Sequence, residues 1–159
     1  MKNLEIYIHI PFCVRKCEYC DFLSFPADDD AKLRYVKGLM AEMIFYGPLM
    51  KNYQVSSVYI GGGTPSSIDE QWIAALMEGV FDCFNVLPEA EISIECNPGT
   101  LSREKLLAYR DAGINRLSIG LQSANNDELK LLGRIHTFEQ FLTNYEVARN
   151  VGFKNINVD

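Results

Sequence analysis

The sequence predicts an α/β fold, an open and partial (β/α) barrel, on three observations. Five short segments alternate apolar and polar residues, as β-strands do, and stretches with helical periodicity separate them. Each strand-helix unit spans roughly 20 to 35 residues, a spacing typical of parallel strands joined by right-handed crossovers. The third observation is that only one face of the strands is apolar, so helices are expected to cover that face alone.

The five predicted strands carry apolar residues on one face: Ile6, Ile8 and Ile10; Val58 and Ile60; Ile92 and Ile94; Leu117, Ile119 and Leu121; Ile156 and Val158. The opposite face is polar or small: Tyr7 and His9; Tyr59 and Gly61; Ser93 and Glu95; Ser118, Gly120 and Gln122; Asn155, Asn157 and Asp159. A doubly wound sheet would have two apolar faces, whereas a barrel lumen that holds water or a ligand fits this polar face. The doubly wound sheet stays open as an alternative, because five strands alone do not show that a sheet curls. In either fold, sites gather at the carboxyl ends of the strands.

Helical stretches separate the predicted strands. The first follows the acidic run Asp28–Asp30 and repeats apolar residues at Leu33, Val36, Met40, Met43 and Ile44. The second follows Ser67–Glu70 and carries Trp72, Leu76, Val80 and Phe84. The third begins near Ser102–Glu104 and stops at Gly113, and the last runs from about Thr137 to Gly152.

Length and composition favour one domain. The chain has 159 residues, 48% of them hydrophobic, which is enough for one sizeable core, so residues 1–159 are treated as a single unit. A net charge of −6 argues against a nucleic-acid partner, because phosphate backbones are recognised largely by Lys and Arg. The first residues enter a strand pattern with no apolar signal core, which predicts a cytoplasmic protein. The chain stops at Asp159, so we expect a domain truncated after the fifth strand.

A cluster of cysteines follows the first strand. Cys13, Cys17 and Cys20 form the spacing C-x3-C-x2-C in the loop, unlike the evenly spread cysteines of a secreted disulfide domain. Thiolates are soft ligands suited to iron–sulfur clusters or zinc. Three thiolates would leave one iron of a cubane open to a small molecule. Zinc needs a fourth ligand, for which His9 is the nearest candidate, and this reading stays an alternative.

A glycine-rich loop, Gly61-Gly62-Gly63-Thr64-Pro65, follows the second strand. Its backbone can approach a ligand closely because no Cβ intervenes, and its amides could point at a carboxylate. A tight turn between strand and helix is the alternative explanation. Among the remaining residues with reactive side chains, Cys83 and Cys96 are expected in the core and not as ligands, and His136 is expected at the surface before a helix.

The run from Tyr7 to Phe22, YIHIPFCVRKCEYCDF, resembles the radical S-adenosylmethionine (radical SAM) signature in the form found in the oxygen-independent coproporphyrinogen III oxidase family. The resemblance implies that residues 1–159 are an incomplete radical SAM core domain, a partial barrel of that type. It implies a [4Fe–4S] cluster on Cys13, Cys17 and Cys20. It also implies that S-adenosylmethionine chelates the open iron and is cleaved to a 5′-deoxyadenosyl radical, with the cofactor supplying the difficult chemistry.

The same resemblance implies a set of cofactor contacts and no catalytic residue. It rests on IECNPGT around Glu95 and on NRLSIGLQS, where Gln122 is expected to end the fourth strand. From the residues alone, Glu95 could equally be a solvated strand end, and the aromatic and basic members could be packing or surface residues. The implied contacts are Tyr7, Tyr19, Gly62, Gly63, Thr64, Glu95, Gln122, Arg134 and Asp159.

One departure from the oxidase pattern selects a branch of the family. The oxidases carry a further cysteine two residues after the third, where this sequence has Phe22. This difference resembles the haem-chaperone branch, which implies haem or a porphyrin as ligand, haem-acceptor proteins as partners, and a reductant such as flavodoxin or ferredoxin. Oligomer formation is compatible with this branch. Coproporphyrinogen III oxidation and a structural metal-binding module are the alternatives.

Overall fold

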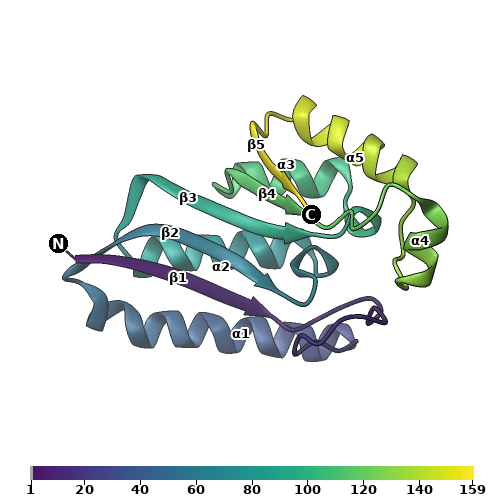
Figure 1. Cartoon of the computed structure of the whole chain (residues 1–159). Helices are drawn as coiled ribbons and strands as arrows, with labels where there is room; N and C mark the ends of the chain where they lie inside the picture. The colour runs from purple at the N-terminus through teal and green to yellow at the C-terminus, as the bar shows by residue number, and fades with distance from the viewer. Residues whose placement is uncertain (1) are drawn as a thin grey trace.

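The computed structural model describes residues 2–159, in which strands and helices alternate along the chain (Figure 1). The strands are β1 (Lys2–Ile10), β2 (Tyr53–Gly62), β3 (Val86–Cys96), β4 (Arg116–Ile119) and β5 (Asn155–Val158). The helices are α1 (Asp29–Tyr46), α2 (Glu70–Cys83), α3 (Arg103–Asp111), α4 (Asn126–Leu131) and α5 (Phe138–Asn150). Short 3-10 turns are η1 (Gly47–Met50), η2 (Pro65–Ser67) and η3 (Pro98–Thr100).

The five strands form one parallel sheet in the order β1-β2-β3-β4-β5. Each crossover leads to the next neighbour in the same direction, so the strand order never reverses. A doubly wound sheet requires such a reversal, and the doubly wound alternative is therefore rejected. The predicted partial (β/α) barrel is confirmed.

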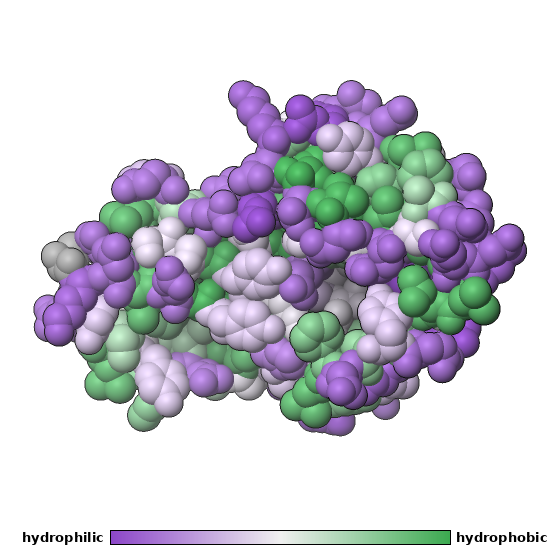
Figure 2. Space-filling view, in the orientation of Figure 1, coloured by the Kyte–Doolittle hydropathy of each residue, from purple (hydrophilic) through white to green (hydrophobic). Residues whose placement is uncertain are grey.

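The two faces of the sheet differ as the alternation predicts. On the outer face Ile10, Ile60 and Ile94 are fully buried beneath the helices. On the inner face Tyr7 is 58% exposed. Figure 2 shows this molecule from the side of Figure 1, with hydrophilic residues around the margin and residues of intermediate hydropathy toward the centre. The core therefore lies between sheet and helices, and the inner face is free to line a site.

The helix boundaries follow from capping residues. The carboxylate of Asp28 accepts a hydrogen bond from the amide of Ala31 at 2.7 Å at the start of α1. Helix α5 begins with a capping box in which Thr137 and Gln140 satisfy each other's backbone amides. Among residues 2–159, no helix has the length and apolar character needed to cross a membrane.

Two details of the expected secondary structure were wrong. Strand β4 ends at Ile119, so Leu121 and Gln122 lie beyond it in a turn. Gln122 has a φ of 74°, a left-handed conformation that no strand residue adopts. The sequence reading also missed α4, a short helix capped by Asn125, because its six residues are too few to show a helical period.

Candidate cofactor and metal site

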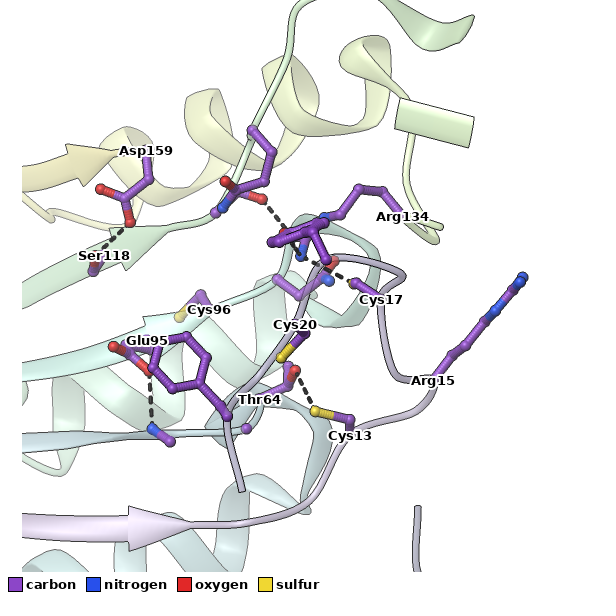
Figure 3. Close-up of a pocket in the computed structure, with 17 residues that line it drawn as sticks. Cys13, Arg15, Cys17, Cys20, Thr64, Glu95, Cys96, Ser118, Arg134 and Asp159 are labelled. Carbon is purple, nitrogen blue, oxygen red and sulfur yellow. Dashed lines mark hydrogen bonds between the residues drawn. The ribbon is translucent and has the colours of Figure 1, made fainter. Parts of the chain in front are cut away.

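A cavity of about 270 Å³ opens at the carboxyl ends of the strands, where parallel α/β folds place their sites. All the site residues expected from the sequence border it, except Tyr7. The structure therefore brings together segments that lie far apart in the chain. The lining comprises Cys13, Arg15, Cys17, Tyr19, Cys20, Phe22, Gly62, Gly63, Thr64, Glu95, Cys96, Asn97, Ser118, Gly120, Gln122, Arg134 and Asp159 (Figure 3).

The cysteine loop runs between β1 and α1 without regular structure. Its base is closed by the amide of Phe25, which donates to the carbonyl of Pro11 at 2.9 Å, and by the amide of Cys13, which donates to Phe25 at 3.2 Å. Cys13 is buried, whereas Cys17 and Cys20 are half-buried. The loop is thus anchored at its base and open at its tip.

The thiols suit an iron–sulfur cluster by their chemistry, and all three border the same cavity. Figure 3 shows the sulfur of Cys13 facing the hydroxyl of Thr64, 3.4 Å away, and that of Cys17 beside Arg134. Within residues 2–159 no three potential ligands already stand close enough together to hold a metal ion. Convergence of the three sulfurs would be completed by the metal itself, which commonly organises its own ligand loop.

The glycine loop packs directly against the cysteine loop. The amides of Gly63 and Thr64 donate to the carbonyls of Ile10 and Phe12 at 2.8 and 2.7 Å. A Cβ on Gly63 would lie 2.8 Å from the Phe12 carbonyl oxygen, so this approach requires glycine. The expectation that these two amides point at a ligand carboxylate is therefore wrong. Their hydrogen bonds are accepted by Ile10, at the end of β1, and by Phe12, in the cysteine loop. The glycines bring the cysteine loop close to the cavity instead.

A half-buried lysine holds the segment that follows the glycine loop. The ammonium of Lys105 on α3 donates to the carbonyls of Ser66 and Ile68 at 2.6 and 2.9 Å. Burial lowers the pKa of Lys105, and the nearby carboxylates of Glu70 and Asp69 oppose that shift. The end of the loop is thereby fixed to a helix of the outer layer.

Glu95 has both carboxylate oxygens engaged. One accepts a hydrogen bond from the hydroxyl of Tyr59 at 2.9 Å, and the other accepts from the amide of Gly62 at 3.0 Å. Burial, and then the hydrogen bond to Glu95, raise the pKa of Tyr59 to about 12, so its hydroxyl stays a donor at neutral pH. The carboxylate is held in one orientation at the cavity edge.

Arg134 connects the cysteine loop with the end of β4. Its guanidinium donates to the carbonyl of Gly120 at 2.6 Å and to the hydroxyl of Tyr19 at 3.3 Å. A third contact, 3.6 Å long, reaches the sulfur of Cys17. A permanent cation therefore lies next to a predicted metal ligand.

The other side of the cavity is formed by Gln122 and Asp159. The amide of Gln122 donates to the backbone carbonyl of Asp159 at 2.7 Å. The Asp159 carboxylate accepts from the side chains of Asn157 at 2.8 Å and Ser118 at 3.5 Å. Asp159 thus lies at the cavity with a donor on each of its carboxylate oxygens.

Two aromatic residues differ in position. Tyr19 borders the cavity, but Tyr7 lies outside its lining on the inner face of the sheet. The Tyr7 ring stacks on Tyr59 with centroids 6.1 Å apart, and its hydroxyl lies 3.2 Å from Nδ1 of His9.

His9, the candidate fourth ligand for zinc, has its Nε2 3.4 Å from the carbonyl oxygen of Leu23. His9 does not border the cavity, which weakens the zinc alternative.

His136 was wrongly expected at the surface. It is 4% exposed, and its Nε2–H donates to the carbonyl of Leu121 at 3.2 Å. Burial, and then the positive charge of Arg134, lower the pKa of His136 to about 4, so the ring is neutral near pH 7. The ring is hydrogen-bonded to the carbonyl of Leu121, the residue before Gln122. It therefore supports the left-handed backbone conformation of Gln122.

The sequence reading missed several lining residues. Ser118 was visible in the polar face of the fourth strand and could have been chosen from that alternation. Arg15 and Asn97 had no periodic signal, because they lie in loops. Cys96 is buried as expected, yet it also borders the cavity, and burial raises the pKa of its thiol, which disfavours the thiolate needed of a ligand.

Comparison with known proteins gives relatives of two kinds. The chain is 38% identical over 162 residues to the "Heme chaperone HemW" of Escherichia coli, covering 98% of this chain and 42% of that protein. It is also 38% identical over 163 residues to the "Oxygen-independent coproporphyrinogen-III oxidase-like protein HemZ" of Bacillus subtilis, covering 99% of this chain and 32% of that protein. The chain therefore spans less than half the length of these curated relatives.

A solved structure and a family profile agree with the fold. Coproporphyrinogen III oxidase (HemN) from Escherichia coli, described as a radical SAM enzyme, matches with a TM-score of 0.91 and 32% identity, over 99% of this chain and 36% of that one. The Radical SAM superfamily profile matches residues 7–159, nearly the whole chain. With the cysteine loop, the glycine loop and the parallel partial barrel in place, the chain belongs to the radical SAM superfamily.

Proposed function

We propose that this chain binds a [4Fe–4S] cluster through Cys13, Cys17 and Cys20 and holds S-adenosylmethionine against it. One observation carries the proposal: the three thiols of one loop and the polar ends of neighbouring strands border a single cavity. Thiolates are the usual ligands of such clusters, and three of them leave an iron free for a chelating small molecule. A structural metal module would need neither the glycine loop nor the fixed carboxylate of Glu95.

Each group has a part in the proposed site. The oriented carboxylate of Glu95 suits an ammonium group, and the guanidinium of Arg134 suits a carboxylate, so the two sides of the cavity match the two charges of an amino acid. Gly62, Gly63, Thr64, Gln122, Asp159 and Tyr19 complete the proposed cofactor contacts, with Tyr7 beside them on the inner face. When bound and reduced, the cluster and cofactor supply a 5′-deoxyadenosyl radical. The chain orients the cofactor and limits access of water.

Within the superfamily we favour a haem-chaperone-like role. Phe22 stands where the resembled oxidases carry a further cysteine, and its ring is 70% exposed at the cavity border. The identity to a relative named as a haem chaperone supports this choice. The proposal includes haem or a porphyrin as ligand, haem-acceptor proteins, a flavodoxin- or ferredoxin-like reductant, and an oligomer in the cytoplasm.

Coproporphyrinogen III oxidation is the second candidate, because the close structural match is to an oxidase. This function would convert propionate side chains of the porphyrinogen into vinyl groups: each loses carbon dioxide and one hydrogen atom, which the 5′-deoxyadenosyl radical would take, and one electron, which an external electron acceptor would take. It predicts substrate turnover, whereas the chaperone function predicts haem binding and transfer without turnover.

The test uses the full-length protein that contains this chain, reconstituted anaerobically with iron and sulfide. We expect about four irons per chain and a reduced-state EPR spectrum that changes when S-adenosylmethionine is added. Haem transfer to an acceptor and coproporphyrinogen turnover, measured on the same preparation, then separate the two candidates. Stoichiometric zinc, or a spectrum indifferent to the cofactor, would contradict the proposed site.

A further inference from the structure

Tyr59 occupies the centre of the inner face, and neither the family resemblance nor the cavity lining singles it out. Strand β2 pairs Tyr59 with Tyr7 on β1 and with Ser93 on β3. The side chain therefore stands between two expected cofactor contacts, Tyr7 on one strand and Glu95 on the other. It does not itself border the cavity.

Tyr59 contacts both neighbours through different parts of its side chain. Its ring stacks on the ring of Tyr7, with an interplanar angle of 16°. Its hydroxyl donates to one oxygen of Glu95 at 2.9 Å, while the amide of Gly62 donates to the other oxygen. Without Tyr59, Glu95 would keep one donor and could rotate about it.

The neighbouring glycine makes room for this arrangement. A Cβ on Gly61 would lie 2.8 Å from the Tyr59 ring and 3.1 Å from the Glu95 carboxyl carbon. Real Cβ atoms do not approach a ring atom as closely as 2.8 Å, so a larger residue at position 61 would displace the Tyr59 ring. The backbone next to the glycine loop is thus matched to the contact between Tyr59 and Glu95.

We propose that Tyr59 is a positioning residue: it fixes the carboxylate of Glu95 and the ring of Tyr7 in the orientations in which they meet the cofactor. This inference rests on the proposed function of the site. Because the hydroxyl is tied to Glu95 and does not ionise near neutral pH, its contribution is the same from pH 6 to pH 9.

The test compares Tyr59→Phe with Tyr53→Phe in the reconstituted full-length protein. Tyr59→Phe keeps the stacked ring and removes only the hydroxyl, whereas Tyr53 begins the same strand at its far end. We expect Tyr59→Phe to weaken S-adenosylmethionine binding about tenfold, the lower end of what loss of one hydrogen bond to a charged group predicts. Tyr53→Phe should leave binding unchanged, and both variants should retain their iron.

Two further readouts separate positioning from general damage. In Tyr59→Phe the EPR spectrum at saturating cofactor should equal that of the parent protein, with only the saturating concentration raised. In a Glu95→Ala background, Tyr59→Phe should cost less than twofold, because the side chain that accepts its hydrogen bond is gone.

The outcomes are distinct. Equal affinities of the parent protein and Tyr59→Phe, with normal cofactor binding, would overturn the role of Tyr59 alone. An undiminished effect of Tyr59→Phe in the Glu95→Ala background would also overturn it. If the iron-loaded parent protein does not bind S-adenosylmethionine, the proposed function fails and the role of Tyr59 fails with it.

Discussion

The cysteine loop and the strand ends border the same cavity but are held in different ways. Between Ile10 and Asp29 the loop has no helix or paired strand beyond one isolated bridge, from Phe12 to Phe25. Leu23, at its tip, is 76% exposed. Glu95, by contrast, stands on a strand paired on both sides, and its carboxylate is fixed by two donors.

The difference matches what each region is proposed to bind. A metal cluster forms strong bonds to its ligands and can order an open loop as it binds. An organic cofactor is held by weaker hydrogen bonds, which are most effective when the protein groups are already oriented. We therefore expect the loop to determine cluster content with little effect on folding, and the strand ends to depend on the stability of the sheet.

The largest expected effect is on the loop. Cys17→Ala in the full-length protein should lower the iron content from about four to below about one per chain, because the cluster loses a ligand. The thermal unfolding of the metal-free protein should be unchanged, since Cys17 is outside the core. Iron and sulfide analysis, with calorimetry of the metal-free form, would check both statements.

Cys83→Ala is the matched control, because this cysteine packs against the core at the end of α2 and away from the cavity. It should keep its iron. Full cluster occupancy in Cys17→Ala would show that the loop is not the ligand set.

The second effect should appear in the sheet. Ile94 is fully buried next to Glu95, and Ile94→Ala should lower the free energy of unfolding by about 4 kcal/mol through the cavity that it leaves. Chemical denaturation would measure this loss. Val158→Ala is the control: Val158 is 41% exposed on β5, so its truncation should cost less than about 1 kcal/mol. Equal losses for the two variants would contradict the assignment of the core to the outer face.

The third prediction concerns pH and His136. Its folded-state pKa of about 4 lies below the ordinary value of 6.5, so the unfolded chain binds more protons between these values. The contribution of this ring to stability is therefore complete above pH 6.5 and is lost as the pH falls through 4. The total change is at most about 3 kcal/mol.

Denaturation curves between pH 4 and pH 7 would test this by comparison with His136→Gln. Glutamine can keep an N–H donor for the Leu121 carbonyl but does not titrate, so the variant should lose less stability on acidification. His9 is present in both proteins and cancels in the comparison. Parallel curves would show that His136 is not the titrating group.

The smallest effect should come from the glycine loop. Gly62 has a φ of 119°, and a Cβ there would lie 2.7 Å from the ring of His9. Gly62→Ala should cost about 2 kcal/mol from this backbone strain and contact. Gly38→Ala is a matched control within α1, where nothing lies within 4 Å, and it should be neutral or slightly stabilising. Thermal unfolding of both variants would measure the difference, and a neutral Gly62→Ala would contradict the strained geometry.

The sequence by itself determined the layers of the fold, and its cysteine spacing indicated where a metal site is expected. Alternation at Ile8, Ile10, Ile60 and Ile94 is a local signal with a period of two residues, and it predicted the buried face correctly. The same alternation predicted the polar inner face that carries Glu95, which borders the cavity. These features are predictable because each depends on residues close together in the chain.

Only the tertiary structure decided how the groups meet. The partners Tyr59 and Glu95 are separated by 36 residues, and their contact depends on the register of two strands. The amides of Gly63 and Thr64 donate to the carbonyls of Ile10 and Phe12, more than 50 residues earlier, which no local pattern reveals. His136 is buried and donates to the carbonyl of Leu121, 15 residues earlier, although its neighbours in sequence are polar or exposed. Hydrogen-bond partners and burial are settled by packing between distant segments, and a single sequence does not record that packing.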